Sequence, residues 1–185
     1  MKKFELTTNT KMFLGKKLFQ IKALISFGDV EAGELGGYIE KEDNLSHDGN
    51  AWVSGNAWVS GDALVSGNAW VSGDALVYGD ARVSGDALVS GDAWVSGDAL
   101  VSGDARVSGD ADYTIVKGFG REYRTTTFFR CKDGKVRVQC GCFYGDLKEF
   151  RAIVKDTHGE SKKAKEYLMI ADLMELHFEE NENDK

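Results

Sequence analysis

Valine recurs at every sixth position through the middle of the chain, from Val53 to Val107. The unit reads Val-Ser-Gly-Asp/Asn-Ala-x, with Tyr78 in place of one serine. Six residues are too few for a helical repeat, and the alternation Ala-x-Val-Ser is typical of a short strand. Ala and Val then point to one side of the strand, whereas x and Ser point to the other. Gly-Asp or Gly-Asn supplies a corner, because glycine tolerates positive φ and Asx side chains bond the neighbouring backbone.

Three such strands and three corners predict a triangular coil of eighteen residues, with Val and Ala filling its interior. Stacked coils would pair as parallel strands about 4.8 Å apart. The repeat resembles the hexapeptide-repeat family, and this resemblance implies a left-handed parallel β-helix over Leu45 to Asp112. Because a narrow interior of valine and alanine offsets little of the entropy of ordering the chain, we expect capped ends and a covered flank.

The outward x positions carry large apolar side chains in eight of ten repeats, including all four tryptophans of the chain. Exposed rows of this size are unusual on soluble monomers. Two alternatives stay open: the terminal segments of the chain cover the rows, or the rows form an interface with a host protein or in a homo-oligomer (dimer or trimer). The candidate interface residues are Trp52, Trp58, Leu64, Trp70, Leu76, Leu88, Trp94 and Leu100. The period places Trp52, Trp70, Leu88 and Arg106 on one face, Trp58, Leu76, Trp94 and Asp112 on a second, and Leu64, Arg82 and Leu100 on the third.

The net negative charge of the chain comes from the same coils. The formal net charge is −7, and residues 49–112 alone sum to −7 from nine Asp and two Arg. This disfavours direct nucleic-acid binding and favours basic partner surfaces, or mimicry of nucleic acid. The corner residues Asn56, Asp74, Asp92 and Asp110 would stack on one edge, and Asp62, Asp80 and Asp98 on another. Such ladders could bind calcium, but a role in bonding the turn backbone is favoured.

Different elements are expected on either side of the repeat. Residues 1–44 read as an N-terminal β cap, in which Ile39 and Leu45 resemble a degenerate first repeat. Residues 113–185 read as a small α+β domain, a hairpin plus two helices, so the fold class is mainly β. The chain start lacks the pattern of a signal peptide, no run could span a membrane, and three cysteines suit reduced thiols, so we expect a cytoplasmic protein.

The C-terminal elements have specific local signals. Asp133-Gly134 lies between the strand-like runs Thr125–Cys131 and Lys135–Cys142, which predicts a hairpin with Cys131 opposite Val136. Asp146 followed by Glu149 is typical of a helix N-cap, and the helix should end at His158-Gly159. A second helix is expected from Ser161 to Phe178; because it is apolar on more than one side, we expect it between two packed surfaces.

Few residues support an enzyme. Hexapeptide-repeat acyltransferases use a histidine base near a coil boundary, and His47 is the nearest candidate here, with His158 and His177 in the C-terminal segment. Cys131, Cys140 and Cys142 would share one face of the hairpin and could hold zinc with His158, although apolar packing is the favoured reading. No cofactor is expected, because no phosphate-binding glycine loop or nucleophile-base-acid set is present.

The two ends of the chain also resemble uncharacterised phage and prophage proteins that enclose a hexapeptide repeat. The residues concerned are 28–40, Cys140-Gly-Cys-Phe through Phe150, and Thr157-His-Gly159. The resemblance implies a phage-encoded protein in the host cytoplasm and brings no catalytic residues. The favoured function is a non-enzymatic scaffold that binds partners or oligomerises. The alternatives are an inhibitor of a host defence protein, anti-CRISPR-like or similar, and a hexapeptide acyltransferase.

Overall fold

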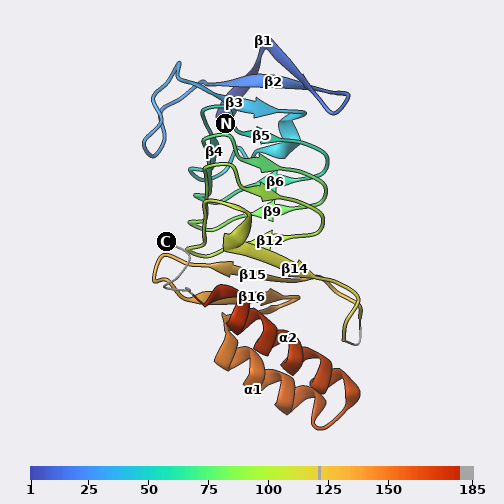
Figure 1. Ribbon diagram of the computed structural model, residues 1–185. Coiled ribbons are helices and arrows are strands. Elements are labelled where there is room, and N and C mark those ends of the chain that lie inside the picture. Colours follow the sequence, from blue (N-terminus) through green and yellow to red (C-terminus); the bar gives the residue numbers. More distant parts are fainter. Residues whose placement is uncertain (121, 180–185) are drawn as a thin grey trace.

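A computed structural model describes residues 1–120 and 122–179 as an elongated molecule with three parts (Figure 1). An N-terminal β hairpin covers one end of a β-solenoid, and an antiparallel sheet with two helices covers the other. The mainly β fold predicted from the repeat is therefore confirmed.

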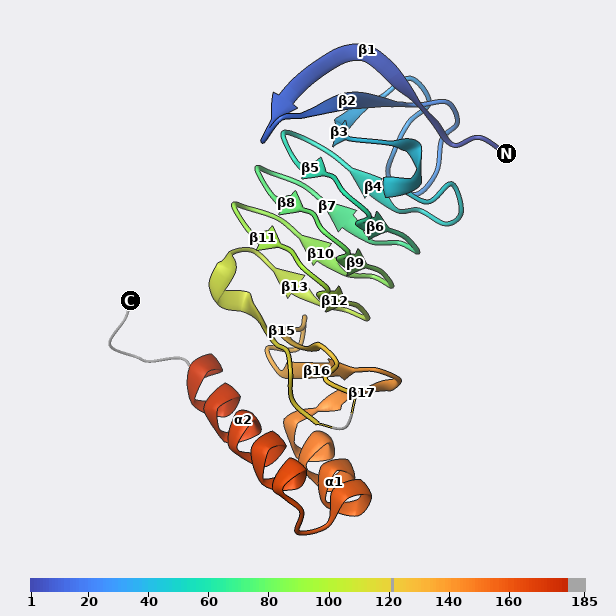
Figure 2. The same ribbon diagram turned by 90° about the vertical axis from the view of Figure 1, so that its right-hand side faces the viewer.

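The solenoid consists of ten two-residue strands, one for each hexapeptide, which form three parallel sheets (Figure 2). Val53 pairs with Val71 and Val59 with Val77, which confirms the eighteen-residue coil. The repeat valines and alanines are almost completely buried in one continuous core. The strands are β4 (Trp52–Val53), β5 (Trp58–Val59), β6 (Leu64–Val65), β7 (Trp70–Val71), β8 (Leu76–Val77), β9 (Arg82–Val83), β10 (Leu88–Val89), β11 (Trp94–Val95), β12 (Leu100–Val101) and β13 (Arg106–Val107).

Glycine at the corners allows the coils to stack closely. Gly73 has φ +68°, and a methyl group added there would lie 2.9 Å from both the amide nitrogen and the carbonyl oxygen of Gly91. The amide of Asp74 donates to that same carbonyl oxygen at 2.8 Å. The corner thus needs glycine for its backbone conformation and for its space.

The N-terminal cap continues the solenoid. β1 (Phe4–Phe13) and β2 (Lys16–Ala23) form an antiparallel hairpin, and β3 (Leu35–Ile39) pairs with β2 on one side and with β5 on the other. Ile39 pairs with Val59, and Leu45 forms an isolated bridge with Val65. Both residues therefore occupy the positions of repeat valines, as predicted.

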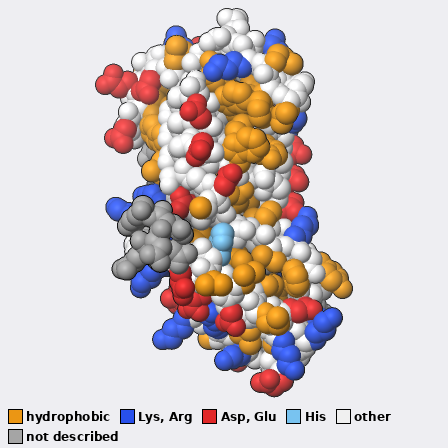
Figure 3. Space-filling view, in the orientation of Figure 1, with side chains coloured by type: hydrophobic (Ala, Val, Ile, Leu, Met, Phe, Trp, Pro, Cys, Tyr) orange, Lys and Arg blue, Asp and Glu red, His pale blue; other side chains and the backbone are white. Residues whose placement is uncertain are grey.

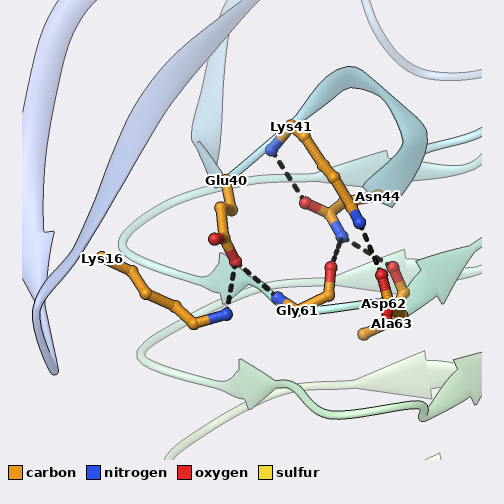
Figure 4. A network of polar contacts seen from close by, with 7 residues as sticks. All are labelled: Lys16, Glu40, Lys41, Asn44, Gly61, Asp62 and Ala63. Carbon is orange, nitrogen blue, oxygen red and sulfur yellow. Dashed lines mark hydrogen bonds and ion pairs between the residues drawn. The ribbon is translucent and has the colours of Figure 1, made fainter.

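Two polar side chains complete the end of the first coil (Figure 4). Asn44, in the 3-10 helix η1 (Glu42–Asn44), is fully buried and donates to the carbonyl oxygens of Gly61 at 3.0 Å and Ala63 at 2.8 Å. Glu40 accepts from the amide of Gly61 at 2.6 Å and from Lys16 at 2.7 Å. The two bonds from Asn44 replace those that the amides of a preceding coil would donate to these carbonyl oxygens, and Glu40 adds a bond to a corner amide.

The C-terminal sheet has four strands rather than the two of the predicted hairpin. Its order is β14 (Tyr113–Val116), β15 (Thr126–Arg130), β16 (Val136–Cys140), β17 (Phe143–Asp146). The solenoid pattern ends at Val107, because the 3-10 helix η2 (Asp110–Asp112) turns the chain away. The prediction that Asp112 occupies an outward position on the second face is therefore wrong.

Helices α1 (Leu147–His158) and α2 (Lys162–Phe178) pack on the far side of this sheet (Figure 2). The predicted capping box is confirmed: Asp146 accepts from the amide of Glu149 at 2.8 Å, and Glu149 accepts from the amide of Asp146 at the same distance. The expectation that α2 lies between two packed surfaces is wrong. One side of α2 buries against the sheet and α1, whereas Met169, Leu173 and Leu176 are exposed. Neither α-helix among the described residues is long and apolar enough to cross a bilayer.

Candidate protein-binding face

The chain itself covers much of the outward row of the sheet β4-β7-β10-β13, although the buried indole nitrogen of Trp52 has no hydrogen-bond partner among the described residues. Trp52 is fully buried, and its ring meets Phe27 edge-on with centroids 5.4 Å apart. The indole nitrogen of Trp70 donates to Ser54 Oγ at 3.0 Å. The guanidinium of Arg106 ends the row by donating to backbone carbonyl oxygens, including that of Ala105 at 2.8 Å. This face offers no continuous apolar surface.

The sheet β6-β9-β12 is interrupted by charge. Exposed Arg82 lies between Leu64 and Leu100, which are both half-buried. The amide of Leu100 donates to Thr127 Oγ1 at 2.9 Å, so the C-terminal sheet closes the lower end of this face.

The third sheet carries an apolar row that becomes more open toward the C-terminal end. Trp58 meets Phe13 of β1 edge-on, with centroids 4.2 Å apart, and Leu76 is only 9% exposed. Trp94 is 50% exposed. We call the outward side of β5, β8 and β11, with Trp58, Leu76, Tyr78 and Trp94, the Trp94 face. Figure 3 shows hydrophobic side chains gathered on the solenoid beside a column of acidic ones.

A hollow lies at each end of the Trp94 face. Beside the tip of β1, a hollow of about 350 Å³ is lined by Lys11, Phe13, Asn56, Trp58, Asp74 and Leu76. Beside β14, a hollow of about 310 Å³ lies between Trp94, Tyr78, Tyr113 and Ile115. The hollow beside β1 is mainly apolar, whereas Ser96, Asp110 and Thr114 give the hollow beside β14 a more polar wall. A half-exposed aromatic ring next to such hollows is typical of a protein-binding surface.

Acidic corners border the Trp94 face on both sides. Asp62 forms an ion pair with Lys41 at 2.6 Å, and Asp98 pairs with Lys117; the lysine hydrogen bond is the main cause that lowers the pKa of each carboxyl group. The remaining carboxylates of the two borders, except Asp110, have no hydrogen-bond or ion-pair partner among residues 1–120 and 122–179: they are Asp74, Asp80 and Asp92. The expectation that corner side chains bond the turn backbone is therefore wrong for these three residues, and the borders are only partly neutralised.

Side chains occupy the open edge of β11, where a further coil would pair. Asp110 accepts from the amide of Trp94 at 2.9 Å, and the hydroxyl of Tyr113 accepts from the amide of Ser96 at 3.3 Å and donates to the carbonyl oxygen of Trp94. Burial raises the pKa of Tyr113, which keeps its hydroxyl protonated. These two side chains block strand addition at this edge, as natural sheet edges require.

His47 is engaged on both sides of its ring. Its Nε2 lies 2.7 Å from Glu42 Oε1, its Nδ1 accepts from the amide of Lys3 at 3.1 Å, and the ring stacks on Phe4 with centroids 4.3 Å apart. A general base needs a free ring nitrogen facing its substrate. The structure therefore places His47 against the N-terminal cap as a packing and hydrogen-bonding residue.

The predicted hairpin register is wrong by one residue. Arg130, not Cys131, lies opposite Val136, and the amide of Cys131 bonds the carbonyl oxygen of Lys135. A shift of one residue moves a side chain to the other face of a sheet. Cys131 therefore packs in the solenoid core, where burial raises its pKa to about 12, whereas Cys140 packs against the helices.

The remaining zinc candidates line a separate hollow of about 250 Å³ between α1, α2 and the sheet. Cys140, Cys142 and His158 contribute to its wall, together with the rings of Phe150 and Tyr167. Within the part of the chain that the structure describes, no three His, Cys, Asp or Glu side chains are placed to hold a metal ion. The rings and aliphatic groups make this hollow mainly apolar.

Sequence reasoning did not identify Phe13, Phe27 or Tyr113 as parts of the outer faces. Phe13 and Trp58 are 45 positions apart, and no local pattern links them. Only the fold of the N-terminal cap, including the segment between β2 and β3, shows which tryptophans are covered.

Comparison with known families supports the solenoid. The model of the YdcK beta solenoid repeat matches residues 57–73 and 81–97 of this chain. Both matched segments lie within the hexapeptide region and together cover well under half of the sequence. The chain has no match among the curated proteins. The match thus supports the β-solenoid architecture and gives no activity.

Proposed function

We propose that this protein is a non-enzymatic protein-binding scaffold and that the Trp94 face is its docking surface. The observation that carries the proposal is the half-exposed ring of Trp94 between two hollows. Ala93 and Val95, on either side of Trp94, are fully buried in the solenoid core. A ring held on so rigid a support loses little conformational freedom on binding, and buried aromatic anchors supply much of the affinity of protein interfaces.

The origin of the protein, its location and the chemistry of its partner are proposed from other features. The resemblance of the terminal segments supports a phage origin, and with it inhibition of a host defence protein as the second candidate function. The free thiols of Cys131, Cys140 and Cys142 suit the reducing cytoplasm. Acidic borders along an apolar row suit a target that exposes basic and apolar groups together.

Site-specific photo-crosslinking tests the scaffold proposal. A photoreactive phenylalanine analogue at position 94 should form a discrete adduct in lysate of the native host. The same analogue at position 82, an exposed outward position on the sheet β6-β9-β12, is the matched control and should form none. Equal labelling from both positions, or none from position 94, would contradict the proposal. An adduct with the mass of two chains would identify a homo-oligomer.

Self-association could instead use α2, because Met169 is 71% exposed, Leu173 57% and Leu176 67%. These residues recur at i, i+4 and i+7 and so form one apolar stripe. If copies associate through this stripe, light scattering should give a mass above that of one chain for the wild type and one chain for Leu173→Glu. A mass that falls with Trp94→Glu and not with Leu173→Glu would place self-association on the Trp94 face.

A further inference from the structure

We infer that the Trp94 face accepts a basic amphipathic helix of a partner protein, lying along the solenoid axis with one apolar side chain over each coil. This inference rests on the proposed function, because it specifies the partner of the same face. Three features support it: the spacing of the coils, the charge on the two borders and the shape of the surface between them.

The spacing favours a helix. Trp58, Leu76 and Trp94 stand at one residue per coil on directly paired strands. Coils stack about 4.8 Å apart, and an α-helix rises about 5.4 Å per turn. Over three coils the two repeats drift apart by only about 1 Å, so apolar side chains at one per turn can follow the row. The hollows beside Phe13 and beside Tyr113 receive the bulk at either end.

The negative charge of the two borders favours basic residues on both flanks of that helix. Asp74 and Asp92 lie on one border and Asp80 on the other, and none of the three has a side-chain partner among the described residues. A helix that brings lysine or arginine to both sides of its apolar stripe would pair these carboxylates as it buries the tryptophan. An acidic helix would face repulsion from both borders at once.

A second copy of this chain fits the same charges less well. Two Trp94 faces laid together would oppose their acidic borders. The exposed stripe of α2 belongs to a helix in which three lysines are balanced by three acidic residues. Neither surface provides basic residues on both flanks of an apolar stripe, so the partner is a different protein.

Synthetic peptides test the chemistry of the partner on the full-length chain. The probe is a helical peptide with leucine once per turn and lysine on both flanks; one control replaces every lysine by glutamate, and another replaces every leucine by serine. Titration followed by tryptophan fluorescence and calorimetry should show binding of the lysine peptide alone, weakening as salt is added. Trp94→Ala should abolish it, whereas Arg82→Ala, on another face, should not.

Substitutions at the corners separate the borders from total charge. The double variant Asp74→Asn/Asp92→Asn keeps the fold, because Asn56 already occupies the same row. It should bind the lysine peptide about three- to tenfold more weakly at low salt. Asp86→Asn/Asp104→Asn removes equal charge from the corner that does not border the Trp94 face, and it should bind like the wild type.

Three results would overturn the inference: equal binding of the glutamate peptide, lysine-peptide binding that survives Trp94→Ala, or equal loss in the two double variants. Self-association that Trp94→Glu abolishes would also overturn it, since a second copy would then be the occupant. If the crosslink from position 94 to another protein appears and the lysine peptide fails to bind, the docking face stands and only this partner class falls.

Discussion

Lys3 illustrates how one residue in the cap couples stability to pH. It is only 1% exposed, and its ammonium donates to the carbonyl oxygen of Ala51 at 2.8 Å beside the ring of Phe27. Burial lowers its pKa to about 8, from 10.5 for a free side chain. Between these two values the unfolded chain holds a proton that the folded chain has released, so stability from this residue rises with pH across that window and is constant below it.

The test compares the wild type with Lys3→Met. The free energy of unfolding in urea should shift in favour of the wild type as pH rises from about 8 toward 10.5. Lys163→Met, at an exposed position of α2, is the control and should give a pH-independent difference. A flat difference for Lys3→Met would mean that its ammonium is as well solvated as the control.

The corner glycines separate backbone strain from steric clash. Gly73→Ala would combine φ +68° with a methyl group 2.9 Å from two backbone atoms of Gly91. Gly134→Ala has a similar φ of +76° with no atom within 4 Å of the added methyl group. We expect Gly134→Ala to lose about 1 kcal/mol of stability and Gly73→Ala to lose at least about 2 kcal/mol more, measured by denaturant unfolding. Equal losses would show that strain alone makes glycine necessary at the corner.

At the scale of elements, the N-cap of α1 provides a direct test of helix signals. Asp146 and Glu149 satisfy each other's amides, so Asp146→Ala should destabilise the protein by about 1 kcal/mol. Asp156→Ala, near the C-terminal end of the same helix, removes an equal charge that the helix dipole disfavours, and should cost nothing. Thermal unfolding of the two variants beside the wild type gives the comparison.

Local sequence signals predicted the secondary-structure elements correctly, but they predicted the packing around those elements less well. The six-residue period, the Asp133-Gly134 turn and the Asp146 cap each depend on neighbours in sequence, and each is confirmed. The register of the hairpin was wrong because Gly134, at φ +76°, closes a three-residue loop, and loop length sets which faces the strands present. That difference moved Cys131 from the helix side of the sheet to the solenoid side.

The candidate site depends on contacts that no local pattern carries. The sequence predicted which residues point outward, but it did not predict which of them are covered and which are exposed. Trp52 is hidden by Phe27, and Trp94 is half exposed because the β1 hairpin ends near Trp58. The six-residue period makes all outward positions equivalent in sequence, whereas the segments at the ends of the solenoid make them differ in exposure.

At the scale of the whole molecule, the C-terminal sheet serves as the lower cap of the solenoid. Phe129 and Cys131 belong to the solenoid core, Ala105 bridges to Cys131, and buried Thr127 accepts from the amide of Leu100. One continuous core crosses the boundary between the repeat and the C-terminal sheet. The two parts should therefore unfold together.

Two probes can observe the parts separately. All four tryptophans lie in the solenoid, and α1 and α2 lie beyond the sheet, so indole fluorescence and helical circular dichroism report on opposite ends. Their urea transitions should coincide in the wild type. Thr127→Val keeps the side-chain shape and leaves the Leu100 amide without its acceptor, which should lower the free energy of unfolding by about 1–3 kcal/mol in both signals. Thr157→Val, exposed on α1, should change neither. Separate transitions, or a shift in fluorescence alone, would show that the C-terminal part folds independently and that the solenoid does not need it as a cap.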